Sequence, residues 1–187
     1  MPTLLRWMTS ISVVTLLIGC SASIPIDPAS PYYKVAPGST LKVNQRIEIP
    51  PGVTRVFMQN GAIVRNFDQY APNCNVEVYR LEQERAQYIE PGEYRIHRVQ
   101  NTVEEVVQKQ RLQVAALGTG PWLMMASGGA DRPDVHKGYH LWVEDPAGNF
   151  TRLSCRGAFD TPWDARPPSI NQMRRALGDI ADLVLAN

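Results

Sequence analysis

The sequence predicts a mainly β domain, folded as an antiparallel β-sandwich or partly open barrel with one C-terminal α-helix. Three observations lead to this class. From residue 40 onward, short segments alternate apolar and polar residues in the period-two pattern of half-buried strands. Turns rich in glycine, proline and asparagine separate these segments at fairly regular spacing. The final segment instead has helical spacing, and we expect this helix to cover one open face or end of the sheet.

Two strands and a tight hairpin are expected first. Residues 41–49 read LKVNQRIEI and place their leucine, valine and isoleucines on one face. The turn at residues 50–52 leads into a second strand, VTRVFMQ. Asn60-Gly61 follows it, and because both positions of a two-residue hairpin turn need φ > 0, this dipeptide predicts a hairpin into AIVR.

Further strands follow along the chain. One begins near Cys74, and another follows the turn at residues 90–92 as YRIHRV. Residues 102–117 have helical spacing at their start, but their β-branched residues favour a strand. Near the end, YHLWVE and FTRLSCR flank residues 145–149, which predicts a hairpin with a five-residue loop.

A helix is expected over about residues 169–186. Ser169 is a suitable N-cap directly after Pro167-Pro168, which stops the preceding element. The apolar stripe comprises Ile170, Met173, Leu177, Ile180 and Val184. Gly178 lies within this run and weakens the helix by about 1 kcal/mol relative to alanine.

The N-terminal residues have the pattern of a secretory signal. Arg6 is the only charged side chain before a charge-free apolar run at residues 11–19. This run is too short for a membrane span, which needs about 20 apolar residues. Leu17-Ile18-Gly19-Cys20 closes the run and resembles the lipobox of bacterial lipoproteins. The resemblance implies that residues 1–19 are removed and that Cys20 carries acyl chains, which attach the protein to a membrane.

The expected cellular location and the domain organisation follow from this resemblance. Ser21 implies sorting to the periplasmic side of the outer membrane, with the inner membrane as the less favoured place. Residues 20–39 contain four prolines and predict a semi-rigid tether, whose apolar second half we expect to lie against the domain. Residues 40–187 then form a single periplasmic domain. This part resembles small uncharacterised proteobacterial envelope lipoproteins, which implies no particular activity.

The remaining cysteines predict a disulfide. With Cys20 assigned to lipid, Cys74 and Cys155 form one even pair in an oxidising compartment. A bridge closing a loop of about 80 residues stabilises a fold by about 4 kcal/mol in the chain-entropy model. Two buried free thiols are the alternative.

The richest polar cluster is ADRPDVHKGYH, in which Asp134, His136 and His140 are weak candidates for metal ligands. Gly138 and the preceding proline argue against a helix, on which two histidines four apart could share a metal. On a strand both histidines point to the same side, but about 13 Å apart at about 3.3 Å per residue. Zinc ligands lie about 2 Å from the metal. We therefore expect a solvated loop leading into a strand, and no metal site.

Composition and motifs exclude several function classes. The formal net charge of +1 gives no broad basic field for nucleic acid. Ser154-Cys155-Arg156 departs from the Ser-x-Gly-Cys-x-Arg pattern of L,D-transpeptidases, because the glycine is missing and the arginine comes one place early. The Gly-x-Ser-x-Gly elbow and a phosphate-binding loop are also missing from the sequence. We expect no catalytic activity and no cofactor.

These features predict a membrane-anchored envelope lipoprotein that acts as a non-catalytic binding or assembly module, with another envelope protein as its partner. Residues 118–129 are expected to form a buried strand; if exposed, Trp122, Met124 and Met125 would contact a partner or an acyl chain. A carrier of a lipid or acyl chain in a β half-barrel is the alternative, and a metal-dependent enzyme the third. A wide apolar cavity would favour the carrier, whereas an exposed apolar patch together with a filled core would favour the binding module.

Overall fold

The described part of the chain folds mainly as β structure. The computed structural model describes residues 27–30, 33–105 and 134–186. Its strands are β1 (Thr40–Val43), β2 (Ile47–Ile49), β3 (Arg55–Gln59), β4 (Ala62–Val64), β5 (Asn73–Val78), β6 (Gln87–Ile89), β7 (Gly92–Glu105), β8 (Val135–Glu144), β9 (Phe150–Arg156) and β10 (Ala181–Val184). The helical elements in these ranges are α2 (Ile170–Leu177) and the short 3₁₀ helix η2 (Gly178–Ile180).

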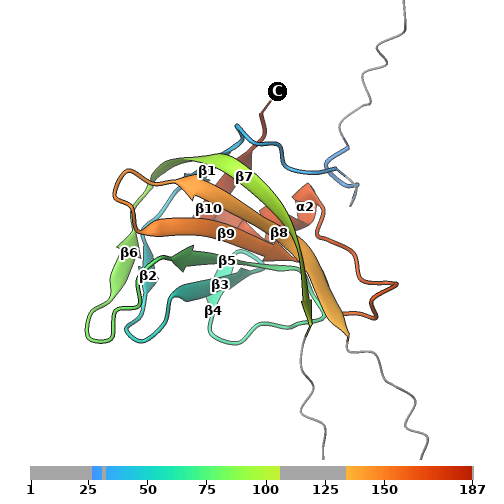
Figure 1. The fold of residues 1–187 in the computed structure, drawn as a ribbon, viewed down its shortest axis with the longest axis horizontal. Helices are drawn as coiled ribbons and strands as arrows, with labels where there is room; N and C mark the ends of the chain where they lie inside the picture. The colour runs from blue at the N-terminus through green and yellow to red at the C-terminus, as the bar shows by residue number, and fades with distance from the viewer. Residues whose placement is uncertain (1–26, 31–32, 106–133, 187) are drawn as a thin grey trace, which may run out of the picture.

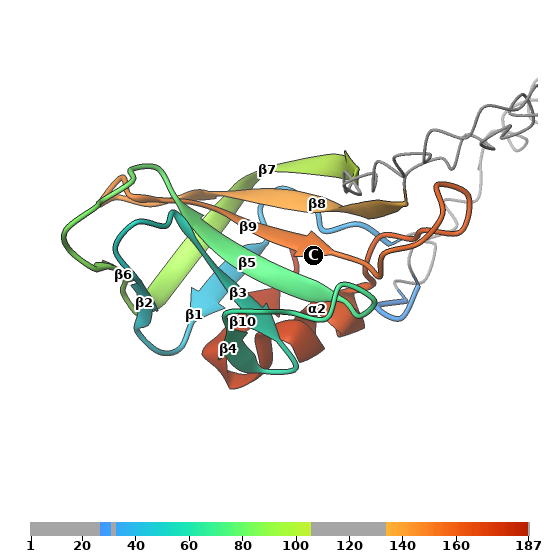
Figure 2. The same ribbon diagram turned by 90° about the horizontal axis from the view of Figure 1, so that it is seen from below.

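Eight strands form one curled antiparallel sheet, in the order β10-β1-β7-β8-β9-β5-β3-β4, and β2 pairs with β6 beside it (Figure 1). Helix α2 contacts β3 and β5 near one end of this order and β10 at the other. The sheet therefore curls around the helix, which lies on its concave side (Figure 2). This arrangement confirms the predicted partly open barrel with a C-terminal helix.

The predicted hairpin turns are confirmed. Asn60 and Gly61 have φ angles of 52° and 77°, and the flanking residues Gln59 and Ala62 pair directly. In the β8–β9 loop, the Asp145 carboxylate accepts hydrogen bonds from the backbone N–H groups of residues 147, 149 and 150, at 2.8–3.0 Å. Local turn chemistry therefore fixes both hairpins.

The helix is shorter than the expected range of residues 169–186. Ser169 forms the predicted N-cap, in a capping box with Gln172, but α2 ends at Leu177 and Gly178 adopts φ 54°. The chain then continues as β10, antiparallel to β1. The prediction was wrong beyond Leu177 because Gly178 is the C-cap of the helix. The backbone of Gly178 also packs on the backbone of Gly61, where a Cβ on Gly178 would collide.

The core fills the space between the sheet and the helix. The fully buried side chains of α2 are Ile170, Met173 and Leu177, and strand residues such as Leu41, Ile96, Leu141 and Leu153 are 0% exposed. Val35 is also buried, and the backbone N–H of Gly38 donates to the Ile96 carbonyl at 2.8 Å. The second half of the predicted tether therefore lies against the domain, as expected.

No helix in the described residues has the length and hydropathy to span a membrane.

The long β7–β8 hairpin corrects one expectation. β7 runs to Glu105, so the strand predicted from residue 102 is confirmed that far, and residues 106–117 lie outside the described ranges. β8 begins at Val135, where a solvated loop was expected, and His136 is only 4% exposed. The loop prediction was wrong here because pairing with β7, together with hydrogen bonds to residues 157 and 160 just after β9, holds residues 135–138 in the sheet.

Candidate functional site

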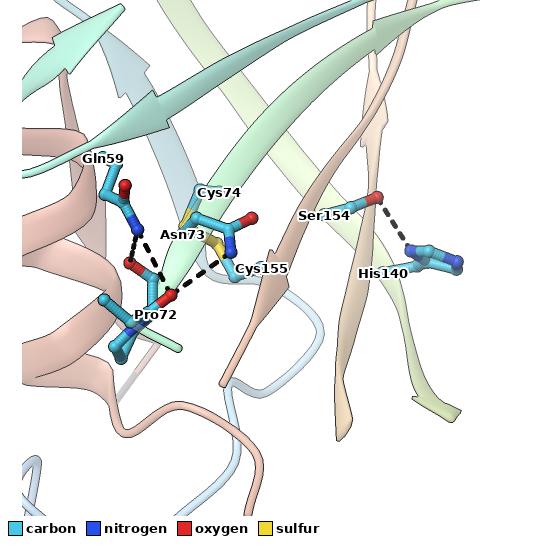
Figure 3. Close-up of a disulfide and its surroundings, with 8 residues drawn as sticks. Gln59, Pro72, Asn73, Cys74, His140, Ser154 and Cys155 are labelled. Atoms are coloured by element: carbon cyan, nitrogen blue, oxygen red, sulfur yellow. Dashed lines mark hydrogen bonds between the residues drawn. A yellow bond between two sulfur atoms is a disulfide. The ribbon is translucent and has the colours of Figure 1, made fainter. Parts of the chain in front are cut away.

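The predicted disulfide is present. Cys74 on β5 and Cys155 on β9 are directly paired in the ladder, with an S–S distance of 2.07 Å, and both are 0% exposed (Figure 3). Their side chains belong to the core on the concave side of the sheet. Because successive side chains of a strand point to opposite faces, the residues that flank each cysteine lie on the convex side, away from α2.

These flanking residues belong to a larger polar surface. The polar sheet face is defined by Asn73, Asn75, Glu77, Arg98, Glu104, His140, Trp142, Arg152, Ser154 and Arg156. Strand register places them in cross-strand rows over β7, β8, β9 and β5. One row runs Arg98, Trp142, Arg152 and Glu77, and the next contains His140, Ser154 and Asn75. Polar and charged side chains thus gather at the middle of the sheet.

Trp142 is flanked by two guanidinium groups. Arg98 Cζ lies 4.2 Å and Arg152 Cζ 4.8 Å from its ring centroid, within the range of cation–π attraction. Arg152 is held in turn by Glu77, whose Oε2 accepts from Nε at 3.0 Å and Nη2 at 2.9 Å. The carboxylate fixes Arg152, and Arg152 fixes the indole ring.

A second ion pair bridges β7 and β9 over the strand between them. Arg156 Nη2 lies 2.7 Å from Glu104 Oε2, and the Arg156 side chain is 8% exposed. On β8 the residue paired with Arg156 is Gly138. Glycine presents no side chain beneath the ion pair, and a Cβ at this position would collide with the Cys155 carbonyl.

His140 and Ser154 form the third contact. His140 Nδ1 lies 2.8 Å from Ser154 Oγ (Figure 3). Burial lowers the pKa of His140, and the positive charge of Arg152 lowers it further. A neutral histidine beside a serine hydroxyl is an arrangement that nucleophilic catalysis uses. Ser154 is only 2% exposed, however, so the geometry favours a hydrogen bond that orders the two side chains.

Unpartnered polar atoms mark this face. Five buried side-chain atoms in the described ranges have no hydrogen-bond partner: Asn73 Oδ1, Asn75 Nδ2 and Oδ1, Trp142 Nε1 and Arg156 Nε. All five belong to the polar sheet face. An unpaired buried polar group costs about 1–3 kcal/mol, and folded proteins leave few of them. Their concentration on one surface is the strongest sign of a binding site in the described structure.

The weak metal candidates do not converge. His136 Nδ1–H donates to the Gly157 carbonyl at 2.9 Å, whereas His140 bonds Ser154. Asp134 immediately precedes β8. Within the described residues, no group of three or more His, Cys, Asp and Glu side chains could hold a metal ion. Cys20, Trp122, Met124 and Met125 lie outside the described ranges.

One open cleft of about 460 Å³ lies beside the start of α2. Its lining combines charged and polar side chains, among them Asp160, Asp164 and Arg175, with apolar residues such as Ala158 and Pro167. It is separate from the polar sheet face and from the filled core.

No family model, curated protein or solved structure matches the chain.

Proposed function

We propose that the protein is a membrane-anchored envelope lipoprotein that acts as a non-catalytic binding module, with the polar sheet face as its binding surface. The lipobox-like sequence ending at Cys20 supports the anchor. Seven residues lead from Cys20 to Asp27, where the described domain begins. At about 3.6 Å per extended residue, this segment reaches at most about 25 Å. Such an anchor would hold the domain close to the membrane surface.

The unpaired buried atoms of the polar sheet face carry the proposal. Asn75 is 1% exposed, yet neither atom of its amide has a partner. A ligand could reach these atoms only if the side chains that cover them turned aside, and completing their hydrogen bonds would then recover free energy that the unbound fold forgoes. The fixed Arg152–Trp142 pair adds an aromatic and a cationic contact, the residue types enriched where interfaces bind most strongly.

The core supports a binding module over an acyl-chain carrier. A carrier needs apolar space inside the half-barrel, but Ile170, Met173 and Leu177 occupy the concave side and are fully buried. The described cleft beside α2 is open and carries the charged side chains of Asp160, Asp164 and Arg175. An acyl chain would therefore have to displace side chains of α2 from the described core.

Affinity purification from native membranes tests the binding surface. Arg152→Glu reverses a charge at the centre of the polar sheet face and repels Glu77. Arg175→Glu, at an exposed position of α2, is the matched control. We expect a stoichiometric envelope partner with the wild type and the control, and its loss with Arg152→Glu. Equal partner recovery from all three would contradict the proposal.

Membrane fractionation tests the anchor separately. Cys20→Ala removes the thiol that would be acylated, so we expect the protein to leave the outer-membrane fraction. Cys74→Ala is the matched control, since it removes a cysteine in the core without touching the anchor. Unchanged attachment of Cys20→Ala would show that lipid on this residue does not hold the protein.

A further inference from the structure

The unpartnered atoms specify the chemistry of a ligand. Three of them are N–H donors, on Asn75, Trp142 and Arg156, and two are amide oxygens, on Asn73 and Asn75. We propose that the polar sheet face contains a subsite for a carboxylate-bearing peptide, in which the carboxylate accepts from the Arg156 guanidinium and a peptide group pairs with the Asn75 amide. This inference rests on the proposed function, because it names what the same face recognises.

The charge balance of the face favours an anion. Four guanidinium groups lie on or beside it, from Arg55, Arg98, Arg152 and Arg156, against the carboxylates of Glu77 and Glu104. The lowered pKa of His140 keeps its ring neutral at pH 7, so the histidine does not change this balance. The excess is positive, and hydrogen bonds between a guanidinium and a carboxylate are among the strongest in proteins.

Two cationic residues flank Asn75 in the sheet. Ser154 lies directly opposite Asn75 in the β5–β9 ladder, which makes Arg152 and Arg156 its diagonal neighbours. Such neighbours lie about 7–8 Å apart at their Cα atoms, within reach of long side chains. On the other side, Asn75 pairs with Phe57, whose ring stacks on Phe67 at 4.6 Å. Asn75 therefore has cationic residues on one neighbouring strand and an aromatic residue on the other.

A peptide fits the unpaired set better than a simple anion does. The Asn75 side chain offers one carbonyl acceptor and an amide donor, the complement of a peptide N–H and C=O. Phosphate dianion carries mainly acceptors, so it would leave the oxygens of Asn73 and Asn75 unpaired. A ligand with both an amide and a carboxylate can satisfy donors and acceptors together.

The Trp142 indole N–H provides the readout for a binding test. The full chain, labelled with ¹⁵N, would be titrated with N-acetylglycine, which joins an amide to a carboxylate. N-acetylglycinamide is the control probe that lacks the negative charge, and inorganic phosphate is the control probe that lacks the peptide group. The chain has four tryptophans, so Trp142→Phe assigns the indole signal. We expect a saturable shift with N-acetylglycine and an affinity at least about tenfold weaker for the other two probes.

Two variants and a control locate the subsite. Asn75→Asp supplies an internal carboxylate beside Arg152 and Arg156. This carboxylate can pair with the two arginines and so preserve the fold, and we expect the variant to lose N-acetylglycine binding. Arg156→Gln should weaken binding about tenfold or more by removing a charged donor. Arg175→Gln, which removes the same charge from α2, should leave it unchanged. Thermal unfolding of each variant confirms that the fold is retained.

The outcomes separate this inference from the proposed function. A shift that does not saturate, or one that persists unchanged in Asn75→Asp, overturns the subsite. Equal affinity for phosphate overturns the peptide chemistry. If N-acetylglycine fails while partner recovery still depends on Arg152, the ligand chemistry is wrong and the binding surface stands. If binding of N-acetylglycine holds but no partner depends on Arg152, the subsite stands and the envelope-partner proposal fails.

Discussion

Arg156 on β9 forms an ion pair with Glu104 on β7, at 2.7 Å between Nη2 and Oε2, across the intervening strand β8. The two residues come from strands that are not neighbours in the sheet. They can meet because Gly138 is the β8 residue paired with Arg156 and carries no side chain. The ion pair holds Arg156 in a buried position while its Nε remains unpaired.

Gly138→Ala should therefore destabilise the fold. The new Cβ would collide with the carbonyl of Cys155, which is backbone and cannot move aside cheaply. Overpacking of this kind costs about 1–3 kcal/mol, which urea unfolding would measure. Gly92→Ala is the control, because its nearest neighbour is the Tyr94 ring at 3.8 Å, an ordinary contact. Equal stability of the two variants would contradict the steric account.

The Cys74–Cys155 bridge should contribute about 2–5 kcal/mol to the free energy of unfolding. The bridge joins residues 81 apart in sequence, so it restricts the unfolded chain strongly. Urea unfolding of the wild type with and without reductant measures this difference. The double variant Cys74→Ala/Cys155→Ala controls for other effects of the reductant and should not respond to it. A wild type that is equally stable after reduction would contradict the prediction.

His140 should make stability fall on mild acidification. Because burial and Arg152 lower its pKa, the folded state binds a proton less readily than the unfolded state, whose histidine has a pKa of about 6.5. The contribution of neutral His140 to the free energy of unfolding is therefore fully present above about pH 7. This contribution is lost as the pH falls through the lowered pKa. We expect Tm to drop between pH 7.5 and pH 5.5.

Variants isolate the contribution of His140 to this drop. His140→Gln removes the titrating group and should reduce the fall in Tm, whereas His97→Gln, at an exposed position of β7, should retain it. Carboxylates also titrate at the acid end of the range, so the comparison is between variants at each pH. An unchanged pH profile in His140→Gln would show that this histidine is not the sensitive group.

Local chemistry explains which parts of the fold the sequence predicts well. Asn60-Gly61 and Asp145 form their turns from neighbouring residues alone, and the Ser169 cap needs only Gln172. The end of α2 was missed because Gly178 meets Gly61, a contact with a distant hairpin. The β-strand at His136 was missed for the same reason, since pairing with β7 overrides the loop signals around it.

The polar sheet face depends still more on distant pairing. Asn75, Ser154 and His140 are unremarkable polar residues within alternating strands, and nothing in their local sequence brings them together. Only the β5–β9–β8 register places them in one row. A partial signal existed, because residues next to the predicted disulfide had to share the face opposite to it. The unpaired atoms can be identified only from the three-dimensional structure.

Site-specific photo-crosslinking in cells tests the polar sheet face most directly as the binding surface. Gln100 is exposed on β7 beside this face, where it pairs with His140, so a photoreactive residue there would touch a bound partner without replacing a ligand-binding group. The same residue at Arg175 on α2 is the control. We predict a discrete cross-linked product from position 100 and none from position 175. A product from position 175 alone, or equally from both, would contradict the account.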